Sequence, residues 1–244
     1  MSQVKDQVAL VIGAGDATGG AIAKRFAREG YTVVATRRRQ EELQPLVNEI
    51  EAEGGKAHGF GCDARDEDSM VDLFARIEAE LGEVSVVIFN IGANVYFPIT
   101  ETTGRVYRKV WEMAAFAGFL TGREAAKAML PRNRGTIIFT GATASLRGGS
   151  GFSAFSGAKF ALRALAQSMA RELGPQGIHV AHAVIDGAID TAFIRDNFPD
   201  RYALKEQGGI LNPDHIADQY WQLHQQPRDS WTHELDLRPW METF

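Results

Sequence analysis

The sequence predicts an α/β protein with a doubly wound parallel sheet of about seven strands and helices on both faces of that sheet. Short apolar runs alternate with amphipathic stretches along most of the chain, which is the pattern of strands joined by crossover helices. A glycine-rich turn follows the first apolar run. The 244 residues are 45% hydrophobic and contain no repeat or linker, so we expect one domain over residues 1–244.

The first half of the chain contains four predicted strands and three predicted helices. Val8–Ile12 is continuously apolar and rich in β-branched residues, as expected for a strand that a sheet buries on both faces. Thr18–Glu29 follows as a helix, because its apolar residues fall on one face of the helical period. The alternation continues with the strand Tyr31–Thr36, the helix Gln40–Ala52, the strand Ala57–Cys62, the helix Asp66–Leu81 and the strand Val84–Phe89.

The second half repeats this alternation with longer helices. Gly174-Pro175 ends one of these helices, and Pro213 suits the first turn of another. In order, the elements are the helix Val106–Met129, the strand Gly135–Thr140, the helix Gly151–Leu173, the strand Ile178–Ile185, the helix Pro213–His224 and the strand Leu235–Leu237. Asp186–Leu211 is the least regular segment, and we predict a mobile substrate loop there.

Composition and charge exclude several classes of protein. The net charge is −5, and basic residues cluster only at Arg37–Arg39, which argues against a nucleic-acid partner. The single cysteine, Cys62, rules out an internal disulfide, and the histidines lack zinc-ligand spacing, so no metal is expected. We expect a cytoplasmic protein, because the sequence shows neither a signal peptide nor a membrane-length apolar run. Cys62, His179 and His182 are interpreted as structural residues.

The glycine-rich turn is the strongest functional signal. It joins a strand to a helix, where backbone N–H groups and the helix dipole can bind a pyrophosphate, as in a Rossmann-like dinucleotide domain. The alternative is a turn that is only structural. The predicted cofactor-binding residues in this turn are Gly13, Gly15, Asp16, Ala17, Thr18 and Gly19.

The end of the second strand predicts which dinucleotide binds. Arg37 and Arg38 follow that strand directly, beside the expected position of the adenosine ribose. An acidic residue there would bind a free 2′-hydroxyl, whereas arginine suits a 2′-phosphate. We therefore expect NADP(H) to be preferred, with NAD(H) possible. Asp16 could oppose the phosphate, and a solvated basic patch is the alternative.

These features make the chain similar to the short-chain dehydrogenase/reductase family along nearly its whole length. The glycine turn matches the family's first motif in part, with Ala17 in place of one glycine. The resemblance implies that Asp63, with Ala64 beside it, holds the adenine. The family's motif after the fourth strand is Phe89-Asn90-Ile91-Gly92 here, so Asn90 and Gly92 are predicted cofactor residues. Gly187 and Thr191 correspond to the residues that lie near the nicotinamide.

The family's catalytic residues are mostly replaced. The tyrosine-and-lysine signature is Phe155-Ser156-Gly157-Ala158-Lys159, so Lys159 is present and Phe155 stands at the tyrosine position. The serine position is Ala142, or Thr143 if the alignment slips by one, and the asparagine position is Ala115. The resemblance implies that Lys159 holds the ribose. A solvated helix lysine is the alternative.

Three interpretations of the missing groups remain open. The first is a working NADP(H) oxidoreductase with an atypical proton donor, namely Thr143, Thr140, Ser153 or an ordered water. The second is a catalytically impaired NADP(H)-binding sensor, scaffold or partner subunit. The third is different chemistry at the nicotinamide, such as alkene reduction. We prefer the first, because the cofactor features are retained and the two arginines would have little use without a nucleotide.

The substrate is predicted to be a small, apolar carbonyl or alcohol compound. Aromatic residues lie near the expected site, although core packing is the simpler explanation for any single one. They are Phe97, Phe116, Phe152, Phe193 and Trp231. Small residues on two long helices permit close packing, and the resemblance implies a homodimer or homotetramer built on those helices. They are Ala114, Ala115, Ala117, Ala158, Ala161, Ala164 and Ala166.

Overall fold

In the computed structural model, which describes residues 7–243, seven strands form one sheet in the order β3-β2-β1-β4-β5-β6-β7. All neighbouring strands are parallel. The strands are β1 (Gln7–Ile12), β2 (Thr32–Arg37), β3 (Lys56–Gly61), β4 (Glu83–Phe89), β5 (Gly135–Thr140), β6 (Ile178–Ile185) and β7 (Glu234–Leu237). From β1 to β3 the strands are added toward one edge of the sheet, and from β4 to β7 they are added toward the other edge. This reversal between β1 and β4 leaves a crevice at the carboxyl ends of these two strands.

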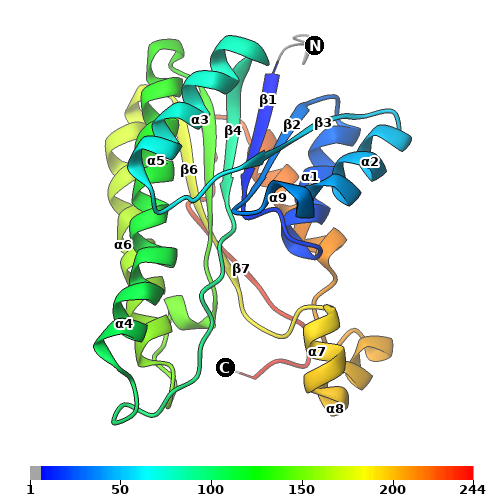
Figure 1. Cartoon of the computed structure of the whole chain (residues 1–244), viewed down its shortest axis with the longest axis vertical. Helices are drawn as coiled ribbons and strands as arrows, with labels where there is room; N and C mark the ends of the chain where they lie inside the picture. The colour runs from blue at the N-terminus through cyan, green and yellow to red at the C-terminus, as the bar shows by residue number, and fades with distance from the viewer. Residues whose placement is uncertain (1–6, 244) are drawn as a thin grey trace.

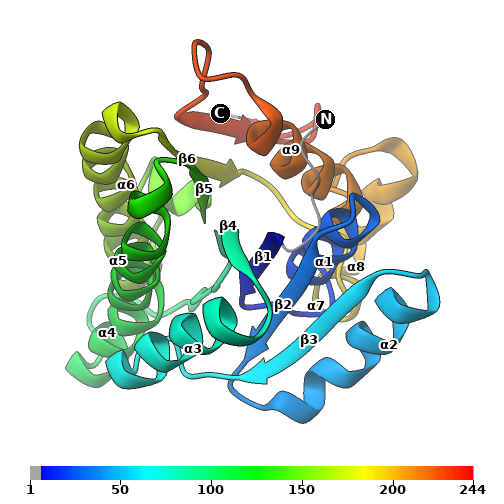
Figure 2. The same ribbon diagram turned by 90° about the horizontal axis from the view of Figure 1, so that it is seen from above.

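Helices cover both faces of this sheet, which confirms the predicted fold class (Figures 1 and 2). They are α1 (Thr18–Arg28), α2 (Gln44–Ala52), α3 (Glu67–Glu80), α4 (Gly104–Trp111), α5 (Ala117–Met129), α6 (Ser153–Leu173), α7 (Ala192–Asn197), α8 (Pro199–Tyr202) and α9 (Pro213–Gln225). Seen from above, α1, α2 and α9 lie on one side of the sheet and α3, α5 and α6 lie on the other.

Two hydrophobic cores result from the alternation of side chains along each strand. Ala9 and Val11 of β1 point into the core beneath α1, α2 and α9. Val8, Leu10 and Ile12 point into the opposite core, beneath α3, α5 and α6. Because both faces are covered, β1 has apolar residues at successive positions rather than at alternate ones.

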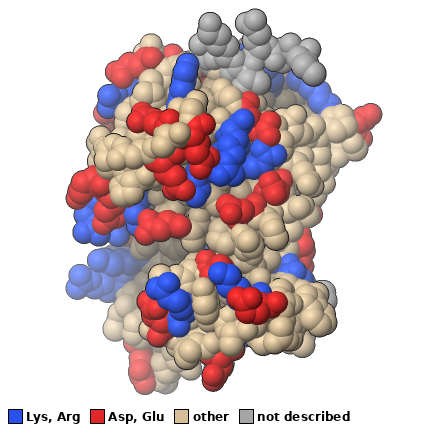
Figure 3. All heavy atoms as spheres, turned by 90° about the vertical axis from the view of Figure 1, so that its right-hand side faces the viewer, with Lys and Arg blue, Asp and Glu red and all other residues tan. Residues whose placement is uncertain are grey.

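The outer surface of α1 and α2 is a mixture of charges. Lys24 of α1 pairs with Glu49 of α2 at 2.8 Å, and Arg28 pairs with Glu53 at 3.0 Å. Figure 3 shows acidic and basic side chains interspersed over this side of the molecule. Exposed pairs of this kind contribute little to stability, so the apolar cores hold these helices on the sheet.

Two regions differ from the sequence prediction. The single helix predicted over Val106–Met129 is α4 and α5 joined by a π-helical turn at Glu112–Phe116. Such a turn accommodates an extra residue without ending the helix. The segment predicted as an irregular loop, Asp186–Leu211, contains α7, α8 and a 3₁₀ turn at Ala203–Gln207, which lie together at the lower right of Figure 1.

Candidate functional site

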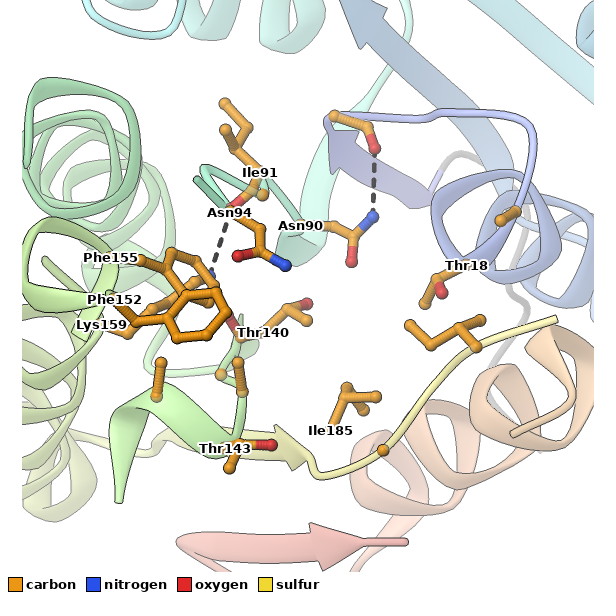
Figure 4. Close-up of a pocket in the computed structure, with 18 of the residues that line it drawn as sticks. Thr18, Asn90, Ile91, Asn94, Thr140, Thr143, Phe152, Phe155, Lys159 and Ile185 are labelled. Atoms are coloured by element: carbon orange, nitrogen blue, oxygen red, sulfur yellow. Dashed lines mark hydrogen bonds between the residues drawn. The ribbon is translucent and has the colours of Figure 1, made fainter. Parts of the chain in front are cut away.

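A cavity of about 800 Å³ opens at the carboxyl ends of β1, β4, β5 and β6. Its wall combines the turn after β1, the loop after β4, the turn after β5, one face of α6 and the segment after β6 (Figure 4). Each of these segments follows a strand end or faces one, because parallel strands bring their carboxyl ends to the same edge of the sheet. The predicted cofactor and catalytic segments therefore converge at one place.

The glycine turn after β1 is closed tightly around its own backbone. A Cβ atom on Gly19 would lie 2.4 Å from the carbonyl oxygen of Gly13, so only glycine fits there. The amide of Asn90 donates to that same oxygen at 3.2 Å and fixes the turn to the end of β4 (Figure 4). Gly15, by contrast, faces open space, with nothing within 4 Å of a Cβ atom. The turn therefore offers bare backbone to the cavity at Gly15.

The predicted cofactor residues of this turn are all in the cavity wall. They are Gly13, Gly15, Asp16, Ala17, Thr18 and Gly19, and they are joined there by Asn90, Gly92, Gly187 and Thr191. Thr191 also caps α7, because its hydroxyl accepts a hydrogen bond from the backbone N–H of Ile194 at 3.1 Å. An open glycine backbone opposite a polar rim fits the shape and chemistry of a dinucleotide.

Lys159 lies on α6 at the base of the cavity. Its ammonium donates to the carbonyl oxygens of Thr140, at 2.8 Å, and Ile91, at 3.2 Å. An ammonium has three donors, so one N–H remains for a ligand. Burial lowers the pKa of Lys159 to about 8, because the low-dielectric surroundings disfavour its charged form. This lysine is therefore not the solvated helix residue that was the alternative.

Apolar residues occupy the positions that the resemblance assigns to the catalytic tyrosine, serine and asparagine. The ring of Phe155 is only 8% exposed, and its centroid lies 5.9 Å from the Lys159 ammonium. Ala142 also lines the cavity and offers only a methyl group. Ala115 lies in the π turn, is 6% exposed and does not line the cavity. Phe155 and Ala142 thus face the cavity, and Ala115 does not.

The substitute donors predicted from the sequence are already engaged or lie elsewhere. The Thr140 hydroxyl bonds that of Tyr220 at 2.9 Å, and the Thr143 hydroxyl donates to Asp186 at 2.5 Å. Both threonines line the cavity. Ser153 is the first residue of α6 and is not part of the cavity wall, although its neighbour Phe152 is. The Thr143 proton is therefore directed to Asp186, and Ser153 lies outside the cavity wall, whereas either hydroxyl of the Thr140–Tyr220 pair could be the donor.

Asp186 is a buried carboxylate that the sequence analysis did not assign to the site. It is 1% exposed, and its Oδ1 accepts from Thr143 while the guanidinium group of Arg147 lies 3.5 Å away. The guanidinium group of Arg238 lies 3.4 Å from its other oxygen. Its place in the sequence, directly after an entirely buried strand, is the feature that could have identified Asp186 as a residue near the site. Since the Thr143 hydroxyl donates its hydrogen bond to Asp186, its oxygen can only accept a hydrogen bond from a ligand.

A second pocket of about 260 Å³ lies beside the ends of β2 and β3, where the predicted adenosine site falls. Arg37 is not free there, because it pairs with Asp16 at 3.3 Å and with Glu42 at 3.4 Å. Arg39 also pairs with Glu42. Within the described residues Arg38 makes no hydrogen bond or ion pair, and its side chain is exposed. The charge of Asp16 is thus balanced by Arg37, and Arg38 is the one arginine of this triplet for which the described residues show no ion pair.

Asp63, which the resemblance places beside the adenine, forms an ion pair within the protein. Both carboxylate oxygens of Asp63 accept from the guanidinium group of Arg65, at 2.9 and 2.6 Å. This hydrogen bonding to Arg65 holds the pKa of Asp63 below its usual value. Ala64 is buried beside it and lines the same pocket.

Of the five aromatic residues predicted near the site, Phe152 lines the main cavity. Phe116 stacks between Trp111 and Phe119, and Trp231 stacks on His179 at 4.9 Å. Phe97 is absent from the cavity wall, and Phe193 lies in a neighbouring groove. Core or surface packing therefore accounts for most of this set.

The residues interpreted as structural are held by packing and hydrogen bonds. His182 is fully buried, with its Nδ1 3.0 Å from Glu234, and burial lowers its pKa to about 4. Burial raises the pKa of the Cys62 thiol to about 11. Among residues 7–243, no group of three or more His, Cys, Asp or Glu side chains could hold a metal ion. No helix in that range is both long enough and apolar enough to cross a membrane.

Comparison with known proteins identifies the family. A sequence model of the family described as short chain dehydrogenase matches residues 7–201. The chain belongs to the short-chain dehydrogenase/reductase family. This confirms the resemblance inferred from the motifs.

Solved structures of this family share the whole fold. The short-chain dehydrogenase from Rhodopseudomonas palustris is 52% identical, with a TM-score of 0.84 over 97% of this chain and 100% of that one. A metagenomic short-chain oxidoreductase in complex with NADP is 27% identical, with a TM-score of 0.80 over 96% and 98%. A 7α-hydroxysteroid dehydrogenase complexed with NADH is 25% identical, with a TM-score of 0.87 over 97% and 94%.

Proposed function

We propose that the protein is an NADP(H)-dependent oxidoreductase that interconverts a small, largely apolar carbonyl compound and its alcohol, using an atypical proton donor. The observation that carries this proposal is the single cavity that joins the glycine turn, the buried Lys159 and the apolar surface of Phe152 and Phe155. One end offers backbone for phosphates, and the other offers an apolar wall of the kind that binds small organic substrates.

Particular residues would hold the cofactor. The backbone of Gly15–Gly19 would bind the pyrophosphate at the start of α1. The free N–H of Lys159 would bind a ribose hydroxyl, and Gly187 and Thr191 would border the nicotinamide. Arg38 would bind the 2′-phosphate, with Asp63 and Ala64 beside the adenine. We also propose that the segment 186–211 closes over the substrate, because Gly187, Ile189 and Thr191 belong to the cavity wall.

The chain's own groups determine how the proton moves. Bound NADP(H) would supply or accept the hydride. Phe155 and Ala142 carry no exchangeable proton, so the proton on the substrate oxygen exchanges with water in the open cavity. Loss of a positioned acid typically lowers the rate about 10²–10⁴-fold, so we expect slow turnover.

The second candidate function is an NADP(H)-binding protein with little or no turnover. The observation that favours it is that both nearby threonine hydroxyls form hydrogen bonds within the protein, Thr140 with Tyr220 and Thr143 with Asp186. Such a protein would act as a sensor, scaffold or partner subunit.

The two candidates differ in a binding and turnover experiment. NADPH binding is measured by quenching of tryptophan fluorescence and by thermal shift, with NADH as the comparison. NADPH consumption is then followed with a panel of aldehydes and ketones. We expect NADPH to bind more tightly than NADH, Arg38→Ala to remove that difference, and slow turnover to be seen. Tight binding without any turnover would favour the second candidate, and no binding would contradict both.

A restoring variant tests the reason for slow turnover. The double variant Phe155→Tyr with Ala142→Ser returns the two hydroxyls that the family places there. We expect NADPH consumption to rise roughly 10²-fold or more in the double variant, because an acid and an oxyanion donor are both regained. Unchanged activity would show that these two groups are not what limits the reaction.

We further propose a cytoplasmic homodimer or homotetramer that acts on a small molecule, with neither nucleic acid nor membrane as a partner. Large apolar side chains are exposed on the outer side of the long helices: Trp111 (43%), Phe119 (41%) and Phe160 (42%). Exposed apolar patches of this kind are typical of subunit interfaces. Light scattering during gel filtration tests the oligomeric state.

A further inference from the structure

The loop after β4 carries a polar side chain that points into the cavity. Asn94 belongs to the cavity wall and is exposed there, and Figure 4 shows its amide group directed into the cavity. Within residues 7–243 this amide makes no hydrogen bond to the protein. Both of its N–H donors are therefore available to a molecule in the cavity.

The residues on either side of Asn94 pack away from the cavity. Ala93 is 6% exposed and belongs to a small apolar cluster that includes Phe155 of α6. Val95 is partly buried and packs against the same cluster. Because its two neighbours are held by this packing, Asn94 has a fixed place in the wall beside α6.

Lys159 fixes the same loop from α6. Its ammonium donates to the carbonyl oxygen of Ile91 at 3.2 Å, in the segment that leads to Asn94 (Figure 4). Figure 4 shows Asn94, Phe155 and Lys159 on the same side of the cavity. The Asn94 amide thus lies at the apolar end, where the side chains of Phe155 and Ala142 offer no hydrogen-bond donor.

The chemistry of an amide at this place suits a carbonyl group. Asparagine side chains are among the groups that stabilise oxyanions in enzymes, because their N–H groups carry a partial positive charge and stay in a fixed position. Such a donor has more effect in apolar surroundings than in water. The rings of Phe152 and Phe155 supply such surroundings in the same cavity wall.

We propose that the side-chain amide of Asn94 donates a hydrogen bond to the reacting oxygen of a carbonyl substrate. This inference rests on the proposed oxidoreductase function and adds a donor to it. When the carbonyl carbon receives hydride, the π electron pair of the C=O bond moves to the oxygen, and the N–H group of Asn94 stabilises that negative charge. The oxygen then takes a proton from water, which leaves hydroxide. Asn94 itself transfers no proton.

Two variants of similar size separate a donor from an acceptor. Asn94→Leu removes all hydrogen bonding, whereas Asn94→Asp keeps acceptor oxygens and replaces the donors with a negative charge. We expect kcat for reduction of acetophenone to fall roughly 10²-fold in Asn94→Leu, with an unchanged Kd for NADPH, and to fall at least as far in Asn94→Asp. Thr100→Asp is the charge control, because Thr100 is exposed on the same loop and lies outside the cavity wall, and its kcat should match that of the wild type. A wild-type kcat in either Asn94 variant would overturn the inference.

A second measurement needs no turnover and includes Thr140 as the competing donor, since Thr140 also lines the cavity. Acetophenone labelled with ¹³C at its carbonyl is bound together with NADP⁺, which cannot reduce it, and the carbonyl stretch is recorded by infrared difference spectroscopy. We expect a lowered frequency in the wild-type protein and in Thr140→Val, and a return toward the unbonded frequency in Asn94→Leu.

Two results of the infrared experiment would contradict the role of Asn94. One is loss of the shift in Thr140→Val with the shift retained in Asn94→Leu, which would make Thr140 the donor. The other is a wild-type complex without a shifted band, through lack of ketone binding or lack of a hydrogen bond. The NADPH binding and turnover assays on the wild-type protein test the proposed function separately.

Discussion

At the scale of single residues, Lys159 and Phe155 show how much of this site follows from spacing. Lys159 is four positions after Phe155, so a helix must place them on one face, and that face lines the cavity. The contacts of Asp186 did not follow, because Thr143, Arg147 and Arg238 reach its carboxylate from distant parts of the sequence. The pairing of Arg37 with Asp16, which joins two separate turns, was equally invisible in sequence.

The buried Lys159 predicts that NADPH affinity depends on pH. Burial lowers its pKa to about 8, so its ammonium is charged below that pH and neutral above it. We expect NADPH affinity to fall as the pH rises through about 8, because the neutral amine is a weaker donor to the ribose. Lys159→Met should bind NADPH more weakly and with a flat profile between pH 7 and 9.5. The exposed Lys109→Met is the control. Fluorescence titration at each pH gives the Kd, and a wild-type profile as flat as that of Lys159→Met would contradict the assignment.

At the scale of secondary-structure elements, the order of strands and helices was predictable and some of their details were not. Each buried strand has an apolar run that is readable in the sequence, as in Val8–Ile12. The π turn at Glu112–Phe116 was not predicted, because a single extra residue hardly disturbs the helical period. The helices of the segment 192–207 were missed because they are too short to show a period.

The glycine turn supports a prediction at this scale, because a side chain would clash with the protein backbone at Gly19 but would meet only open space at Gly15. Gly19→Ala would place its methyl group 2.4 Å from the Gly13 oxygen, so we expect a clearly lower melting temperature. Gly15→Ala meets nothing within 4 Å, so its melting temperature should match that of the wild type. Its methyl group would nevertheless occupy cofactor space, and NADPH affinity should fall at least tenfold. Calorimetry and fluorescence titration separate the two effects, and an unchanged Kd in Gly15→Ala would count against pyrophosphate binding at this turn.

At the scale of the whole molecule, the sheet and its two cores depend on buried histidines that stay neutral. His224 of α9 lies 2.7 Å from the hydroxyl of Tyr31 and 2.8 Å from that of Thr136, and so connects the helix to β5. Burial lowers the pKa values of His224 and His182 to about 4. The sequence analysis interpreted His182 as structural and assigned no role to His224, because the burial of both side chains depends on how α9 and β7 pack.

This burial predicts acid sensitivity. The unfolded chain binds a proton at each histidine near pH 6.5, whereas the folded protein resists it until about pH 4. The free energy of unfolding should therefore fall as the pH drops from 6.5 to 4, by up to about 3 kcal/mol for each histidine. His224→Gln should make this decline shallower, and the exposed His215→Gln on the same helix should not. Urea unfolding at several pH values measures the slope, and parallel curves for His224→Gln and the wild type would disprove the link.

The replacement of tyrosine by Phe155 has a genetic consequence. Every phenylalanine codon becomes a tyrosine codon by a single base change, and every alanine codon becomes a serine codon in the same way. The ring volume that a tyrosine needs is already filled by Phe155, and Ala142 already faces the same cavity. Two point mutations in the gene therefore separate this cavity from one with both hydroxyls. Proteins with nearly the same backbone can differ in whether they carry an acid at this site.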